Sequence, residues 1–184
     1  MEAEPAGNRG WTRGQRALHW WNAGFVVAAF AIAWWMVGVP LSKLLLKFIL
    51  FQVHKTLGIL AFLVVLGRLW LRRRSGRPEP DEAVPPAERR AASAAQAALY
   101  VLLVATPVLG YLTASLAPLR IPTLFLGVIR LPALTGPSRE WFPIIFNLHR
   151  ALAVTLVLLA CGHAAAAMRH HLLGREVLAR MWRG

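Results

Sequence analysis

Six histidines are the residues of this sequence best placed to carry chemistry, because all of them lie in or beside long apolar stretches. They are His19, His54, His149, His163, His170 and His171. An ionisable side chain inside a lipid bilayer is costly, so it marks a functional site by default. A single buried histidine is more often a packing residue that makes a hydrogen bond. Four histidines at matched depths call for a different explanation.

The stretches that carry these histidines are long enough to cross a membrane. Of the 184 residues, 57% are apolar and only 16% are charged, and the mean hydropathy is +0.50. This composition excludes a soluble enzyme, a secreted disulfide scaffold and a disordered chain. The predicted spans are residues 17–39, 48–71, 91–117 and 144–168, and each exceeds the roughly 20 residues that a bilayer requires. We therefore predict an all-α fold, a four-transmembrane-helix bundle in a single domain over residues 1–184.

Charge at the ends of the spans predicts how the chain crosses the membrane. Four spans put both termini and the connecting segment 72–90 on one side, which carries 14 of the 21 Lys and Arg residues. Because cytoplasmic segments are enriched in Lys and Arg, we predict that both termini and the loop 72–90 are cytoplasmic. The Pro-rich segment 118–143 is then a periplasmic loop that caps the bundle.

The acidic residues are divided more sharply than the basic ones. Seven of the eight Asp and Glu residues lie on the predicted cytoplasmic side, and Glu140 alone lies on the periplasmic side. So acid-poor a face either attracts an anion from outside or is a solvated basic fringe, and the sequence leaves both interpretations open. The net charge of +13 does not indicate nucleic-acid binding, because anionic membrane lipid and the positive-inside rule account for charges at span ends.

The direction of each predicted span sets the depth of its histidines. His149 and His163 are 14 residues apart on one span, which places them within about 40° of one helix face and roughly 21 Å apart along the axis. His19 lies at the cytoplasmic end of the first span, and His54 lies near the periplasmic end of the second. The depths therefore pair His19 with His163 near the cytoplasm, and His54 with His149 near the periplasm.

Two histidines at each depth favour haem iron over zinc. Zinc sites use three or four ligands, whereas each depth offers two imidazoles with no cysteine and no buried carboxylate. Two axial imidazoles suit a haem, and the core of a helix bundle can seat its flat macrocycle. The sequence has no Cys-x-x-Cys-His motif, so we predict two non-covalent b-type haems with bis-histidine iron bound between the helices. Iron without an open coordination position favours electron transfer.

Three cations lie where the anionic propionates of such haems would reach the membrane edges. Lys55 and Arg150 directly follow the two periplasmic histidines, and Arg68 lies near the cytoplasmic end of the second span. We predict that these cations bind the propionates; the alternative is that they extend toward the lipid headgroups. Small residues close to the predicted ligands either leave room for a ring or ease helix packing, and they are Gly24, Gly58 and Gly162.

Short motifs follow one another in a fixed order along the chain. They are Leu18-His19-Trp20, His54-Lys55-x-x-Gly58 with Arg68-Leu69, Tyr100…Pro107-x-x-Gly110, and His149 with His163-Ala164-Ala165-Ala166-Ala167…His170-His171. In this order and at these depths they resemble the bacterial cytochrome b-561 family of small four-helix di-haem proteins, over nearly the whole chain. Family members often carry a histidine early in the third span, where this chain has Ser93 and Gln96. Any quinone or proton role of that histidine in the family is therefore not expected for this chain.

The resemblance implies a multi-pass electron carrier of the bacterial inner membrane that works with the quinone pool. In the best-understood members of the family, superoxide at the outer face gives electrons through both haems to ubiquinone. The acid-poor periplasmic face suits a superoxide anion, so the first interpretation is a superoxide:quinone oxidoreductase, a superoxide oxidase. The second is a quinol-oxidising subunit that feeds a periplasmic redox protein. The third is a membrane protein without redox chemistry, whose histidines bind a metal or only pack.

His170 is the candidate for a contact with the quinone. It follows His163 by seven residues, within about 20° of the same helix face and roughly 10 Å nearer the cytoplasm. A neutral imidazole there would hydrogen-bond a quinone carbonyl and supply a proton as the quinone is reduced. Arg68, Arg72 and Arg169 lie at a similar depth and would stabilise a semiquinone anion. His171 points about 80° round the helix from the face of His163, so we interpret it as a surface residue.

Overall fold

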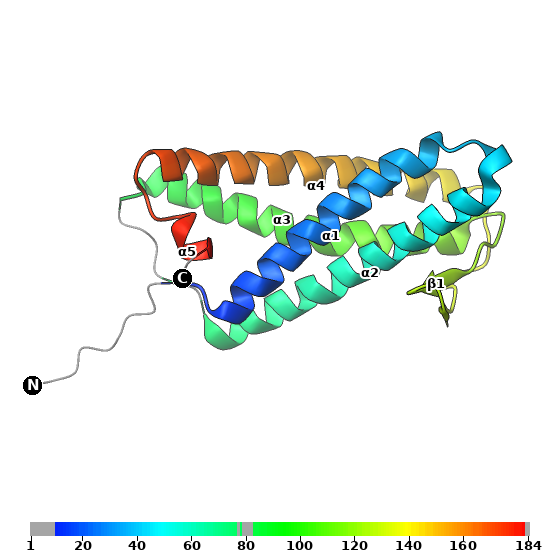
Figure 1. Ribbon diagram of the computed structural model, residues 1–184, viewed down its shortest axis with the longest axis horizontal. Coiled ribbons are helices and arrows are strands. Elements are labelled where there is room, and N and C mark those ends of the chain that lie inside the picture. Colours follow the sequence, from blue (N-terminus) through cyan, green and yellow to red (C-terminus); the bar gives the residue numbers. More distant parts are fainter. Residues whose placement is uncertain (1–9, 77, 79–82, 183–184) are drawn as a thin grey trace, which may run out of the picture.

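The computed structural model describes residues 10–76, 78 and 83–182, and its architecture is a bundle of four long helices (Figure 1). The helices are α1 (Arg13–Gly38), α2 (Leu44–Ser75), α3 (Pro86–Leu116) and α4 (Trp141–Leu172). α1 packs mainly on α2, and α3 packs mainly on α4, so the bundle consists of two helical hairpins. Each of the four helices is long and apolar enough to cross a membrane. The all-α, four-transmembrane-helix prediction is confirmed.

The helices extend beyond the apolar stretches into the charged segments. α2 continues through three arginines to Ser75, and α3 begins at Pro86, so the connection between them is residues 76–85 rather than 72–90. Arginines in the last turn of α2, and Glu88 in the first turn of α3, have the signs that the helix dipole favours. The charge comparison also used residues that lie outside the described part of the chain, namely Glu2, Glu4, Arg9, Arg77, Glu79, Asp81, Glu82 and Arg183.

The connection between α3 and α4 contains a small β-hairpin that lies against α2. Its strands are β1 (Thr123–Phe125) and β2 (Ile129–Leu131), which pair in antiparallel fashion. The Gln52 side chain on α2 donates to the carbonyl of Pro122 and accepts from the main-chain N–H of Leu124, both at 2.9 Å. Thr56, one turn further along α2, accepts from the N–H of Leu126 at 3.2 Å. These contacts hold the hairpin over one end of the bundle.

The C-terminal segment folds back across the opposite end. Gly174, with φ of +74°, follows the end of α4 and lets the chain turn back. The short helix α5 (Ala179–Trp182) then lies against the start of α1. The indole N–H of Trp20 donates to the carbonyl of Met181 at 3.3 Å, and the Trp182 ring packs edge-on against Trp20. Figure 1 shows α5 and the start of α1 together at one end, called here the terminal end. The other, called the hairpin end, carries β1 and β2.

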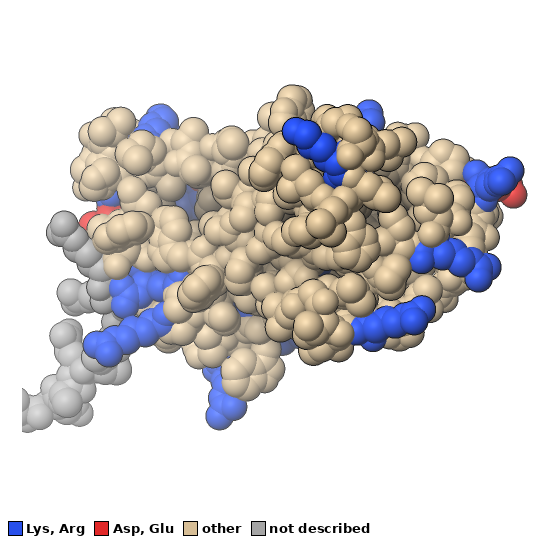
Figure 2. Space-filling model, turned by 45° about the vertical axis from the view of Figure 1, so that its right-hand side comes forward, with Lys and Arg blue, Asp and Glu red and all other residues tan. Residues whose placement is uncertain are grey.

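Few side chains are fully buried, and the outer surface of the bundle is apolar. The exposed fraction is 0% for Val65 and 2% for Asn22, whereas it is 80% for Trp34. On the face that Figure 2 shows, uncharged residues predominate, and Asp and Glu are nearly absent. Exposed apolar helices of this length are stable in lipid, where each helix satisfies its own backbone hydrogen bonds.

Candidate functional site

Two pairs of histidines from different helices face each other, one pair near each end of the bundle. At the terminal end the ring centres of His19 on α1 and His163 on α4 are 6.5 Å apart. At the hairpin end the ring centres of His54 on α2 and His149 on α4 are 6.3 Å apart. The structure thus brings together the same pairs that the depths along the spans predict.

The spacing of each pair fits two imidazoles that share one metal ion. A metal–nitrogen bond of about 2.0 Å and about 1.1 Å from nitrogen to ring centre put two such ring centres roughly 6.2 Å apart. Among the described residues there is no group of three or more His, Cys, Asp or Glu side chains that a metal ion could bind. The donor sets therefore fit a metal that takes two axial imidazoles, as haem iron does, better than a tetrahedral zinc ion.

At the hairpin end, each histidine is oriented by the neighbouring helix with which its own helix packs. Nδ1 of His54 donates to the carbonyl of Ala29 on α1, and Nδ1 of His149 donates to the carbonyl of Thr106 on α3, both at 2.9 Å. Because a carbonyl only accepts, each Nδ1 carries the proton and each Nε2 has a free lone pair. A hydrogen bond of this kind fixes the tautomer and orientation of a metal-ligating imidazole.

Gly110 on α3 makes the position of the His149 ring possible. A Cβ at residue 110 would lie 2.9 Å from Cε1 and 3.2 Å from Nδ1 of His149. The carbonyl of Thr106 points along α3 toward residue 110, four residues later, so the ring reaches that carbonyl by lying directly over the glycine. The sequence motif contains Gly110 but gives no reason for it, because the contact joins residues 39 positions apart.

The terminal-end pair has a different polar neighbour. Nη2 of Arg68 on α2 lies 3.1 Å from Nδ1 of His19, and a guanidinium has donors only, so this Nδ1 accepts and the neutral ring carries its proton on Nε2. Binding of a metal through Nε2 would therefore move the proton to Nδ1 and turn Arg68 away from that nitrogen. His163 is exposed and lies in a run of Gly and Ala residues on α4. A Cβ at Gly162 would meet no atom within 4 Å, and the same holds at Gly24 and Gly58. The three glycines predicted to make room therefore all adjoin open space.

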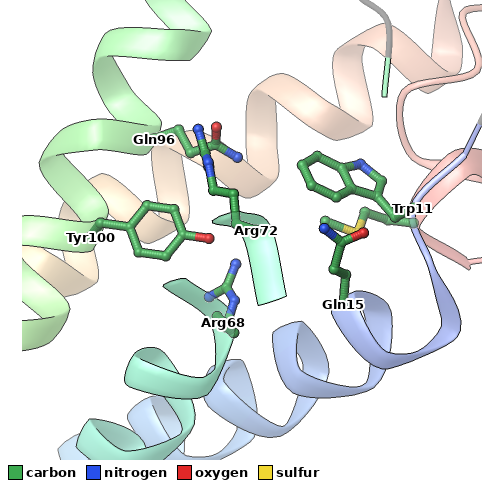
Figure 3. Close-up of a pocket in the computed structure, with 7 residues that line it drawn as sticks. Trp11, Gln15, Arg68, Arg72, Gln96 and Tyr100 are labelled. Carbon is green, nitrogen blue, oxygen red and sulfur yellow. The ribbon is translucent and has the colours of Figure 1, made fainter. Parts of the chain in front are cut away.

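A small cavity lies beside Arg68 at the terminal end, between α1, α2, α3 and the C-terminal segment (Figure 3). Its volume is about 10 Å³, enough for about one water molecule. Arg68, Arg72, Gln96 and Tyr100 form one part of its wall, and Trp11, Gln15 and Met181 form the rest. The guanidinium carbons of Arg68 and Arg72 each lie 5.2 Å from the centre of the Tyr100 ring. The sequence motif contains Tyr100 but gives it no role, and the sequence does not place Gln96 in this wall.

The other predicted site residues lie apart from the histidine pairs. Nζ of Lys55 donates to the carbonyls of Ile121 and Pro122, at 3.4 and 3.3 Å, and so helps to hold the hairpin segment. Arg150 is exposed on α4.

His170 is buried but does not line the cavity beside Arg68. Its Nδ1 accepts from Arg175 at 2.8 Å, and its Nε2 lies 3.6 Å from the Glu88 carboxylate. Glu88 also pairs with Arg175 at 2.9 Å. This network ties the start of α3 to the end of α4 and to the C-terminal segment. His171 is exposed.

Four membrane-spanning helices with facing histidines near each end define a class of protein, a multi-pass membrane protein suited to hold a metal cofactor between its helices. The sequence profile described as prokaryotic cytochrome b561 matches residues 10–184. Cytochrome b561 homolog 2 of Escherichia coli strain K12 is 32% identical over 172 residues, which are 87% of this chain and 84% of that protein. Cytochrome b561 homolog 1 of the same organism is 29% identical over 162 residues, 86% of this chain and 88% of that protein.

The chain belongs to the prokaryotic cytochrome b561 family, as its motifs predict. It is therefore a membrane protein of electron transfer, and the family implies b-type haem. This membership decides against the third interpretation of the sequence, a membrane protein without redox chemistry.

Gly110→Ala tests the fit of His149 on α3. The added Cβ displaces the ring from the Thr106 carbonyl, and loss of such a partner typically lowers metal affinity about 10- to 100-fold. We expect haem titration of the purified protein to show one weakened site. Gly67→Ala on α2 is the control, because its Cβ meets Leu18 at an ordinary 3.6 Å. Full affinity and an unchanged spectrum in Gly110→Ala would contradict the role of this glycine.

Proposed function

We propose that this chain is a di-haem cytochrome b that carries electrons across the membrane from superoxide to ubiquinone. His54 and His149 hold one non-covalent b-type haem, and His19 and His163 hold the other. The observation that carries the proposal is the facing pair of rings near each end, with centres 6.3 and 6.5 Å apart. When bound, the haems supply one-electron transfer between the two ends. With two histidines as ligands, each haem would supply electron exchange at its edge rather than substrate binding at the metal.

In this proposal the terminal end faces the cytoplasm of a bacterium and the hairpin end faces the periplasm. The turns of α2 and α3 at the terminal end carry Arg72, Arg73, Arg74, Arg89 and Arg90. Lys and Arg close to the ends of spans favour the cytoplasmic side. Both termini are then cytoplasmic, and membrane lipid covers the apolar faces between the two ends.

Superoxide is the proposed electron donor at the hairpin end. Lys43, Arg120 and Arg130 are exposed there, and Glu140 is the one acidic residue in the described connections of this end. A basic surface with so little acid raises the local concentration of an anion and its rate of encounter. Each superoxide gives up one electron and leaves as dioxygen.

Ubiquinone is the proposed acceptor at the terminal end, where two electrons from two superoxide ions and two protons, one through His170 and one from water at that end, would convert it to ubiquinol. His170 is the proposed proton donor, because it is a buried imidazole at this end. Arg175 and Glu88 engage both of its ring nitrogens, so this role requires the C-terminal segment to move aside. Among the proposed propionate partners, Arg68 has the best support, because it already touches His19. For Lys55 and Arg150 this role stays a prediction.

A second candidate function, quinol oxidation at the hairpin end, is favoured by one observation. A groove of about 350 Å³ between α2 and the β-hairpin is lined largely by apolar residues, Phe48, Ile49, Gln52, Val53, Thr56, Leu57, Leu124, Leu126 and Gly127. This volume is in the range of small-molecule sites. Electrons from quinol would then pass to a periplasmic redox protein with an acidic surface. Stopped-flow reduction of the haems by superoxide alone, without a partner protein, decides for the first function.

Substitution of the four histidines tests the proposed ligands. His54→Ala and His149→Ala should each remove the same spectral component and about half of the haem, because one axial ligand is lost. His19→Ala and His163→Ala should each remove the other component. His171→Ala is the control and should retain both. If His54→Ala and His163→Ala delete the same component, the pairing is wrong.

Neutralising the basic surface of the hairpin end tests superoxide as donor. We expect Lys43, Arg120 and Arg130 changed together to Gln to slow superoxide-driven haem reduction several-fold, within the roughly 10- to 1,000-fold that electrostatic steering contributes. The ionic-strength dependence should flatten. Lys47 is a further basic residue of this end, but its Nζ donates to the carbonyl of Val39 at 2.8 Å, so it is left intact.

The matched control for this experiment is the triple change of Arg13, Arg73 and Arg90 to Gln, which removes the same charge from exposed positions at the terminal end. Reduction by an uncharged small reductant should be equal in both variants. An unaltered superoxide rate in the hairpin-end variant would leave the solvated-fringe interpretation in place.

His170→Ala tests the proposed proton donor. We expect superoxide to reduce the haems at the normal rate and haem-to-quinone turnover to fall, because the proton source is lost. Arg175→Gln loosens the same network but keeps the imidazole, so its quinone turnover should be retained. Normal quinone turnover in His170→Ala would end the assignment, and equal loss in both variants would assign the effect to the network instead.

A further inference from the structure

The polar surroundings of the two histidine pairs have opposite character. At the hairpin end, both Nδ1–H groups donate to main-chain carbonyls, those of Ala29 and Thr106. At the terminal end, Nδ1 of His19 instead faces a donor, Nη2 of Arg68, at 3.1 Å. One pair therefore lies beside the negative ends of carbonyl dipoles, and the other lies beside a full positive charge.

A second guanidinium strengthens the positive charge at the terminal end. Arg68 and Arg72 lie over the same Tyr100 ring, each with its guanidinium carbon 5.2 Å from the ring centre. Figure 3 shows both side chains in the wall of one small cavity with Tyr100. Nη1 of Arg72 is buried without a hydrogen-bond partner in the part of the chain that the structure describes. Among these same residues, no carboxylate pairs with either arginine.

These surroundings act on a bound haem with predictable sign. A carbonyl that accepts from Nδ1–H makes the imidazole a stronger electron donor. A stronger donor stabilises oxidised iron and so lowers the reduction potential. A fixed cation nearby does the opposite, because it attracts the added electron through a medium of low dielectric. Both effects place the reduction potential of the terminal-end site above that of the hairpin-end site.

We propose that Arg68 and Arg72 set the terminal-end haem as the higher-potential member of the pair, and so direct electrons from the hairpin end to the terminal end. The inference rests on the proposed haem ligation by the four histidines. One electron leaves the site held by His54 and His149, which is oxidised, and reaches the site held by His19 and His163, which is reduced. The transfer needs no proton and no co-reactant. Arg68 and Arg72 are positioning residues of this reaction, since they act through the charge they place beside the ligand.

The sign of the effect does not depend on what the arginines contact when haem is bound. If propionates pair with Arg68, removal of the guanidinium leaves a carboxylate uncompensated beside the iron. If Arg68 turns from Nδ1 of His19 but stays beside the ring without a propionate, its removal takes away the cation itself. In both cases the site becomes more negative, and its potential falls.

Spectroelectrochemical titration of the haem-loaded protein in detergent tests the inference. In the unaltered chain we expect two components, and loss of the higher-potential one in His163→Ala. Arg68→Gln should shift only that component to lower potential. Arg68→Lys keeps the charge, so its higher potential should stay close to that of the unaltered chain. Arg72→Gln should lower this potential by less than Arg68→Gln does. Arg73→Gln removes one charge from an exposed position on the same turn and should leave both potentials unchanged.

Each outcome of the titration has a definite meaning. Unchanged potentials in both Arg68→Gln and Arg72→Gln would overturn the inference, and so would loss of the higher-potential component in His54→Ala. If Arg68→Gln fails to retain haem, Arg68→Lys and Arg72→Gln decide by the same criteria. Failure of the proposed function looks different: the purified chain would bind no haem, or the histidine variants would leave the haem spectrum intact.

Discussion

Hydrogen bonds from side chains to main-chain carbonyls across each helical hairpin join the helices and orient the histidine pair at the hairpin end. Lipid supplies little hydrophobic force between helices, so packing and polar contacts must hold them together. Asn22 on α1 donates to the carbonyl of Ala61 on α2 at 3.0 Å, and His54 on α2 donates to the carbonyl of Ala29 on α1. His149 makes the equivalent bond from α4 to α3. Each helical hairpin thereby orients one of these two histidines, and the association of the two helical hairpins brings the rings together edge-on, with centres 6.3 Å apart.

The spans and the depths of the four histidines were predictable from the sequence, because both depend only on apolar length and helical rise. Two expectations were less accurate, each for its own physical reason. Hydropathy stops at Leu71, whereas the helix dipole and the side chains of Arg72–Arg74 carry α2 on to Ser75. Segment 118–143 was predicted only as a cap, since its short strands are fixed by contacts with Gln52 and Thr56 on α2 rather than by a pattern of their own.

Side-chain partners were the part of the site that the sequence could not supply. Lys55 is adjacent to His54 in sequence, but on a helix adjacent residues point about 100° apart, and its Nζ reaches the hairpin carbonyls instead. Gly110 and Tyr100 carry no chemical signal of their own, and their importance comes from neighbours on α4 and α2. His170 has the expected depth, but the fold-back at Gly174 brings Arg175 onto its ring, and no periodicity along α4 reveals that contact.

α4 has a special place in this architecture because it contributes one histidine to each pair. His149 and His163 lie on one continuous helix, and Pro143 is in its first turn, before either of them. Their separation along the axis is therefore fixed at roughly 21 Å by helical rise alone. Pro107 lies inside α3 rather than α4, so any bend that it favours leaves this separation unaltered. In the proposed di-haem arrangement, a single rigid helix sets the distance that an electron covers, while the polar groups beside the histidine pairs come from α1, α2 and α3. Under the same proposal, substitutions of Arg68 or Arg72 on α2 would change the relative potentials of the two sites without changing the distance between them.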